Sequence, residues 1–163
     1  MKNLFFFLVL ALAVFIQVTL FRELELFGVL PNIALISLFF VAFYIKDNER
    51  VMLSALFLGL LFDVFSGVSF GIFSLIFLSI SFIIILVKEA FVSNQNITTF
   101  ILIVFLGTIS YYLLTVILVN IFNILQIAEY KVDINLIILK YAFFEALYNM
   151  LVAFIFIPAK KFL

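Results

Sequence analysis

One apolar run, from Val51 to Val87, constrains this chain more than any other stretch. A single helix of this length, about 37 residues, would extend roughly 55 Å, whereas the hydrocarbon core of a bilayer is about 30 Å thick. The run must therefore fold back on itself. Glycine and serine tolerate tight turns, so we predict a helical hairpin that bends at Ser66-Gly67-Val68-Ser69.

Small residues and one carboxylate recur at every fourth position of this run: Ala55, Gly59, Asp63, Gly67 and Gly71. Residues four apart share one face of a continuous helix, so the pattern predicts a groove that contains a carboxylate. In lipid, small residues let another helix approach closely. We interpret the groove as a surface for partner binding or for internal packing. The alternative is that Asp63 lies at a hydrated helix end beside the turn.

The composition indicates a polytopic membrane protein, because 69% of the 163 residues are hydrophobic and only 11% are charged. The chain has no histidine and no cysteine, which excludes soft metal ligands, thiolate nucleophiles and disulfides. Its formal net charge is zero, which argues against a nucleic-acid-binding surface. We expect no cofactor and no bound metal.

The hydropathy predicts an all-α bundle of six membrane spans, forming one integral membrane domain over residues 1–163. The predicted spans are 4–21, 27–45, 51–66, 70–87, 97–120 and 134–158. The connections between them are short. The first span continues past a possible cleavage site at Ala11-Leu12-Ala13, which favours an uncleaved helix over a signal peptide.

The distribution of basic residues predicts that both termini are cytoplasmic, since cytoplasmic connections are enriched in lysine and arginine. In this orientation the cytoplasmic side holds Lys2, Lys46, Arg50, Lys88, Lys160 and Lys161. The opposite side holds only Arg22 and Lys131. The alternative is a five-helix arrangement, with the hairpin merged into one span and the two termini on opposite faces.

Polar residues in three spans suggest contacts between helices. Pro31 suits the first turn of the second helix, and Asn32 is either part of that helix start or a buried group that needs a partner. In the fifth span, Thr108, Tyr111, Tyr112 and Thr115 form a stripe that can hydrogen-bond another helix. After Leu118 the pattern becomes amphipathic, and we predict that this tail follows the outer membrane surface.

The last span carries Tyr141, Glu145, Tyr148 and Asn149 on one face. Asn32, Asp63 and Glu145 lie at about the same depth, roughly 20 Å above the cytoplasmic helix ends. We hypothesise that they converge with Lys140 in the outer half of the bundle, because ionisable groups within a membrane tend to face the protein interior. Two alternatives remain: Lys140 extends outward to the interface, and Glu145 is a hydrogen-bonded packing residue.

Two carboxylates can perform acid–base chemistry, but no nucleophile, metal-ligand set or oxyanion hole adjoins them in the sequence. Two acids beside a lysine are also a poor cation site. We therefore expect that the protein is not an enzyme.

The ordered features resemble the rod shape-determining protein MreD family. The matching residues are Pro31-Asn32, Gly59-Leu60-Leu61-Phe62-Asp63, Ser66-Gly67, Gly71, Asn149 and Pro158. The resemblance covers essentially the whole chain, although the abundance of phenylalanine and the presence of Lys140 depart from the family pattern. It implies a fold similar to that of the six-helix substrate-binding subunits of energy-coupling-factor vitamin transporters.

The resemblance also implies a function in cell elongation. A family member would be a non-enzymatic subunit of the bacterial inner membrane that pairs with MreC. Through the complex it would link MreB filaments to RodA and a class B penicillin-binding protein. Asp63, Gly59, Gly67 and Gly71 would be the motif residues, with Pro31, Asn32 and Asn149 beside them.

The leading hypothesis is a scaffold that controls cell shape and peptidoglycan synthesis by docking a partner's transmembrane helix. A chain with almost nothing outside the bilayer acts through lateral helix contacts, short loops or an internal cavity, with membrane lipids around it. The alternative is a substrate-binding subunit of a membrane transporter, for which the buried polar residues would form the ligand site.

Overall fold

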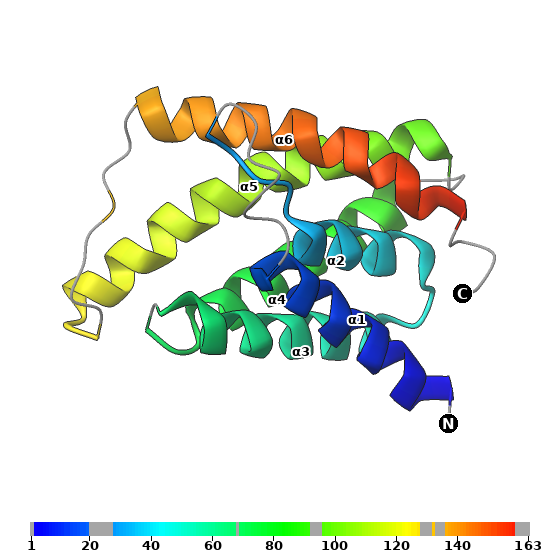
Figure 1. Cartoon of the computed structure of the whole chain (residues 1–163), viewed down its shortest axis with the longest axis horizontal. Helices are drawn as coiled ribbons and strands as arrows, with labels where there is room; N and C mark the ends of the chain where they lie inside the picture. The colour runs from blue at the N-terminus through cyan, green and yellow to red at the C-terminus, as the bar shows by residue number, and fades with distance from the viewer. Residues whose placement is uncertain are drawn as a thin grey trace.

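A computed structural model describes residues 2–19, 28–67, 69–91, 96–127, 132 and 136–158. These residues form six α-helices, as predicted (Figure 1). The helices are α1 (Lys2–Thr19), α2 (Ile33–Tyr44), α3 (Asn48–Ser66), α4 (Ile72–Phe91), α5 (Ile97–Ile124) and α6 (Leu136–Phe156). Within the described residues, α4, α5 and α6 are long and apolar enough to cross a membrane.

Helix α2 lies at the centre of the bundle and packs against all five other helices (Figure 1). Every residue from Ala34 to Tyr44 is buried, which fits a helix whose residues are apolar on all sides. At 12 residues, or about 18 Å, α2 is shorter than the hydrocarbon core. The second helix starts later than the predicted residue 27, and residues 28–32 lead into it as non-helical chain. Such backbone is tolerated at membrane depth when protein surrounds it.

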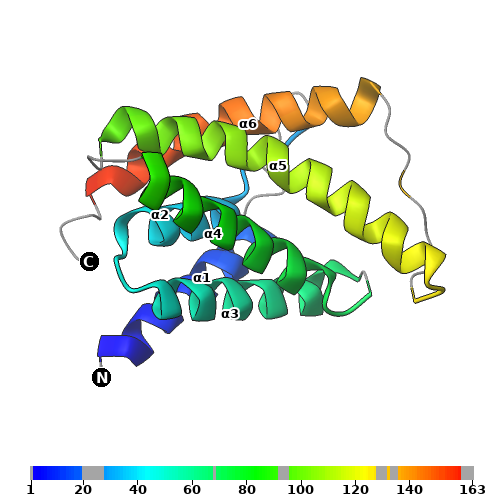
Figure 2. The same ribbon diagram turned by 180° about the vertical axis from the view of Figure 1, so that it is seen from behind.

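The predicted hairpin is present. Helix α3 ends at Ser66 and α4 begins at Ile72, and the two run side by side in opposite directions (Figures 1 and 2). Gly67 ends α3 with a φ of 67°, and Gly71 precedes α4 with a φ of 100°, both left-handed conformations that favour glycine. Val68 lies outside the described residues. This geometry excludes the five-helix alternative, because the hairpin forms two separate helices.

The start of α1, the end of α6 and the connection from α2 to α3 lie at the same end of the bundle (Figures 1 and 2). This arrangement agrees with two termini on one side of a membrane. Four of the residues used to predict the orientation, Arg22, Lys131, Lys160 and Lys161, lie outside the described part of the chain. The cytoplasmic location of the termini therefore stays a prediction.

Helix α5 continues without interruption to Ile124. The predicted amphipathic tail after Leu118 is thus the last part of this helix rather than a separate segment, and Val119 within it is buried. The Asn120 side chain binds the backbone of Val132, donating to its carbonyl at 2.8 Å and accepting from its N–H at 3.0 Å. Whether this part follows the membrane surface stays a prediction.

Candidate functional site

Two of the small residues predicted to form a groove are buried, and one of them, Gly59, lies against α4. Ala55 and Gly59 are buried, and a Cβ atom added at Gly59 would lie only 2.4 Å from the Cα of Ser74. The backbones of α3 and α4 therefore approach too closely here for any side chain at Gly59. Gly67 and Gly71 follow the end of α3 and have open space around them. The five-residue groove does not exist as one surface, because the helix that would align it stops at Ser66.

The carboxylate of Asp63 caps the N-terminus of α4. It accepts hydrogen bonds from the backbone N–H groups of Phe73 at 2.8 Å and Ser74 at 3.1 Å, and from the Ser74 hydroxyl at 2.5 Å. The first N–H groups of a helix have no partner within the helix, and its N-terminus favours negative charge. Asp63 is only 3% exposed, so it is not at a hydrated helix end. It is a buried cap supplied by the neighbouring helix.

The N-terminus of α2 is held by side chains from three helices. Asn32 is the N-cap residue, and its Oδ1 accepts from the N–H of Leu35 at 3.0 Å. The N–H of Asn32 donates to Oδ1 of Asn149 on α6, and the N–H of Ile33 donates to Oε1 of Gln17 on α1, both at 2.7 Å. Both sequence interpretations of Asn32 are thus correct. Pro31 is buried just before the cap, rather than in the first turn.

Two residues of the predicted polar stripe of α5, Thr108 and Tyr112, form hydrogen bonds with α6. Asn149 is fully buried, and its amide group donates to the hydroxyl of Thr108 at 3.1 Å. One turn further along α5, the Tyr112 hydroxyl donates to Oε2 of Glu145. Tyr111 instead packs against Phe73 and Phe77 of α4. Asn149 therefore connects α2, α5 and α6 through its single amide group.

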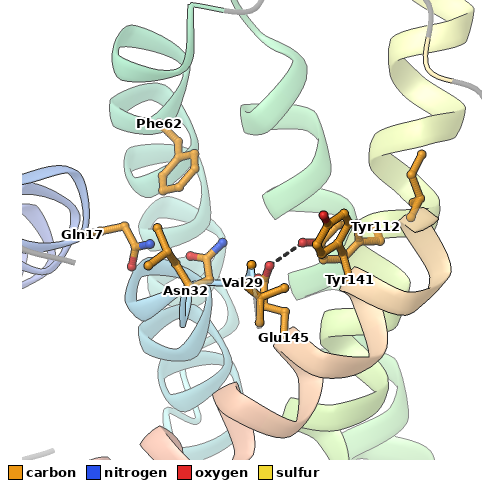
Figure 3. A pocket seen from close by; sticks show the side chains of 10 residues that line it. Gln17, Val29, Asn32, Phe62, Tyr112, Tyr141 and Glu145 are labelled. Carbon is orange, nitrogen blue, oxygen red and sulfur yellow. Dashed lines mark hydrogen bonds between the residues drawn. The ribbon is translucent and has the colours of Figure 1, made fainter. Parts of the chain in front are cut away.

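A cavity of about 500 Å³ lies beside these contacts (Figure 3). It is bordered by α1, the entry to α2, α3, α5 and α6. Its lining residues are Gln17, Gly28, Val29, Leu30, Asn32, Phe62, Tyr112, Ile138, Tyr141 and Glu145. Glu145 is 7% exposed, and its Oε1 forms no hydrogen bond with any described residue. The cavity is thus a mostly apolar space with a few polar groups, as small-molecule sites are.

The structure brings together only part of the predicted cluster. Asn32 and Glu145 line the cavity, whereas Asp63 and Lys140 are not among its lining residues. Asp63 faces the start of α4, and Lys140 is exposed, with Nζ 5.9 Å from the centre of the Phe144 ring. Residues at one depth need not meet, because depth does not specify the face of a helix. The exposure of Lys140 agrees with the outward alternative, and its extension to the membrane interface stays a prediction.

Four residues that the sequence analysis did not assign to contacts between helices stabilise this arrangement. Gln17 is a polar residue near the end of the first apolar run, and Ser74 binds Asp63. Gly107 admits the Phe39 ring, which would lie 2.6 Å from an added Cβ. Lys88, in the last turn of α4, donates to the carbonyl oxygens of Ala42 and Ile45 at the end of α2. The available signal for Gln17 was a polar side chain in an apolar helix, and for Lys88 a basic residue in the last turn of a helix.

No group of three or more acidic, histidine or cysteine side chains suited to a metal ion occurs in the described part of the chain. The hydroxyl groups of Thr108 and Thr115 donate to backbone carbonyls of their own helix. What the polar groups do here is hold helix ends and helix pairs together.

Comparison with known proteins adds the decisive observation. The family model described as rod shape-determining protein MreD matches residues 1–159. The chain belongs to the MreD family. Membership of this family makes the chain a membrane protein of rod-shape determination that is associated with the rod-shape complex. The MreD family is a family of structural, shape-determining proteins. No curated protein and no solved structure gives a significant match.

Proposed function

We propose that this protein is a non-enzymatic, multi-pass scaffold of the bacterial inner membrane that docks the transmembrane helix of MreC. Through that contact it joins MreB, RodA and a class B penicillin-binding protein in one complex. In this proposal the whole chain forms one integral membrane domain with both termini in the cytoplasm.

One observation supports docking on a specific face. An apolar groove of about 370 Å³ lies between α1 and α3. Its lining residues are Leu8, Ala11, Leu12, Phe15, Leu61 and Phe65. Leu8, Leu12 and Phe15 are each more than half exposed, so their side chains are available for lateral contact. Helices associate in lipid through close packing, and a groove with a small residue such as Ala11 offers that packing.

The small-residue groove predicted on α3 is not the docking surface in this proposal. Ala55, Gly59 and Asp63 are buried, and the last two contact α4, so they stabilise the scaffold from within. Gly67, Gly71, Pro31, Asn32 and Asn149 likewise form turns, helix starts and internal contacts. Their effect on partner binding would be indirect, through the shape of the bundle.

The test is to fill the groove. Ala11→Leu should reduce the amount of MreC that co-purifies with the full-length protein, about tenfold if packing is worth about 1.4 kcal/mol. The matched control is Ala13→Leu, because Ala13 is an alanine of the same helix that is also half-buried but does not line the groove. Equal capture of MreC by both variants and by the parent protein would refute docking between α1 and α3.

A second candidate function is a substrate-binding subunit of a membrane transporter. The observation that favours it is the cavity beside Glu145, which is large enough for a small solute. Uptake of a solute that requires this protein and an associated ATPase would establish this function. Loss of rod shape together with unchanged solute uptake after deletion of the protein would support the scaffold instead.

A further inference from the structure

Glu145, which lines the cavity beside α2, has a buried carboxylate oxygen without a hydrogen-bond partner among the described residues. The Tyr112 hydroxyl donates a hydrogen bond to Oε2 of Glu145, while Oε1 is buried and receives no hydrogen bond from the described residues. Lys140, which is exposed on the same helix, lies over Phe144 instead. A buried acceptor without a donor costs about 1–3 kcal/mol, and more if it is charged. A donor brought by a ligand would remove this cost.

Aromatic side chains form much of the remaining wall. Phe62 comes from α3, Tyr112 from α5 and Tyr141 from α6, and all three line the cavity together with Glu145 (Figure 3). A cation is attracted to the face of an aromatic ring, and a carboxylate accepts a charge-assisted hydrogen bond from an N–H group. Three rings and one unused carboxylate oxygen are therefore the features that recognise an ammonium group.

The cavity also contains hydrogen-bond donors at its α1 and α2 side. The carbonyl oxygens of Gln17 and Asn32 are already used, because they accept from the backbone N–H groups of Ile33 and Leu35. Their amide NH₂ groups belong to side chains that line the cavity, and they suit an oxygen acceptor on the same ligand. A volume of about 500 Å³ accommodates a group of this size.

We propose that this cavity binds a primary ammonium group linked to an oxygen acceptor, as in the phosphoethanolamine unit. The ammonium donates to the carboxylate of Glu145 and lies against the three rings, while the amides of Gln17 and Asn32 bind the phosphate oxygens. The unit comes from either a lipid headgroup or a free solute. Gln17 is near the end of α1 and Tyr141 near the start of α6, so the cavity is in the half of the bundle away from the ends of the chain. This inference does not depend on partner docking.

The experiment uses the purified full-length protein and two arms. In the first, nanodiscs contain phosphatidylethanolamine, phosphatidylcholine or phosphatidylglycerol, and retained lipid is measured by native mass spectrometry. In the second, phosphoethanolamine is added to delipidated protein in detergent, and the shift in Tm is measured. Binding in the first arm alone identifies a headgroup, and a Tm shift in the second identifies a free solute. Phosphatidylcholine should bind less, because its ammonium has no N–H donor.

Glu145→Gln should weaken binding about tenfold, since it removes the charge and preserves the shape. The matched control is Glu49→Gln, which neutralises an exposed carboxylate at the start of α3. Tyr141→Leu removes one exposed ring and provides a second test if Glu145→Gln does not fold. It should weaken binding several-fold, by about 1 kcal/mol.

Four results would overturn the proposal. They are no binding in either arm, equal retention of phosphatidylglycerol, undiminished binding by both cavity variants, and occupancy of the cavity only by a side chain of a partner protein.

Discussion

The hydroxyl of Ser74 donates to the carboxylate of Asp63 at 2.5 Å, which joins the first turn of α4 to the last part of α3. The N–H of the same serine donates to the same carboxylate oxygen at 3.1 Å. The hairpin is therefore closed by a charged cap at a buried position. In a low-dielectric environment such a cap stabilises the helix end strongly, because unpaired N–H groups there would have no water to bind.

Asp63→Asn should lower the free energy of unfolding by about 1–3 kcal/mol, measured by thermal unfolding in detergent. Asparagine has one acceptor oxygen, so its NH₂ group would face a donor of α4. Asp47→Asn is the control, because Asp47 caps α3 at an exposed position through Oδ1 alone. That variant keeps both bonds and should change stability by only a few tenths of a kcal/mol. Equal losses would contradict the role given to Asp63.

Gly59→Ala should force α3 and α4 apart, since the new Cβ would lie 2.4 Å from backbone atoms of Ser74. The expected cost is about 1–3 kcal/mol. Gly67→Ala is the control that separates the steric clash from the cost of backbone conformation. Gly67 has a positive φ, but no atom lies within 4 Å of a Cβ added there. Its cost should be about 1 kcal/mol, from conformation alone. A Tm for Gly59→Ala at or above that of Gly67→Ala would show that the two helices can separate freely.

Asn149→Ala should destabilise the bundle by about 2–3 kcal/mol, because it removes two hydrogen bonds. The hydroxyl of Thr108 loses its donor, and the buried N–H of Asn32 is left without an acceptor. Hydrogen exchange at the Asn32 amide should accelerate. The Ile33 amide, bound by Gln17, serves as the internal reference. Thr108→Val is the milder comparison, since it removes only the acceptor of the Asn149 amide. Unchanged exchange at Asn32 would argue against this junction.

Lys88→Met should destabilise the end of α2 by about 1–2 kcal/mol, since Nζ donates to the carbonyl oxygens of Ala42 at 3.0 Å and Ile45 at 2.8 Å. Methionine has a similar length and no donor. Lys46→Met is the control, because Lys46 is exposed at the same end of the bundle. Thermal unfolding of both variants measures the difference, and equal Tm values would exclude a capping role for Lys88.

Much of the architecture was predictable from local patterns. The length of the apolar run from Val51 to Val87 required a hairpin, and its glycines identified the turn. The spacing of Thr108 and Tyr112 predicted a face of α5 that hydrogen-bonds another helix, and the structure shows that this helix is α6. The predicted cluster of Asp63 with Glu145 and Lys140, in contrast, rests on their similar depth in the membrane and is wrong for Asp63. Depth follows from counting residues, but the face that each residue presents to its neighbours depends on how the helices pack.

The sequence by itself determined the number of helices, their approximate bounds and the position of the hairpin, because apolar length and glycine placement act over a few residues. Only the tertiary structure decided that Asp63 caps α4, that Gly59 lies against Ser74 and that Glu145 borders a cavity with an unused oxygen. Each of these contacts joins different helices. Their geometry depends on the rotation and separation of whole helices, which no local pattern in the chain specifies.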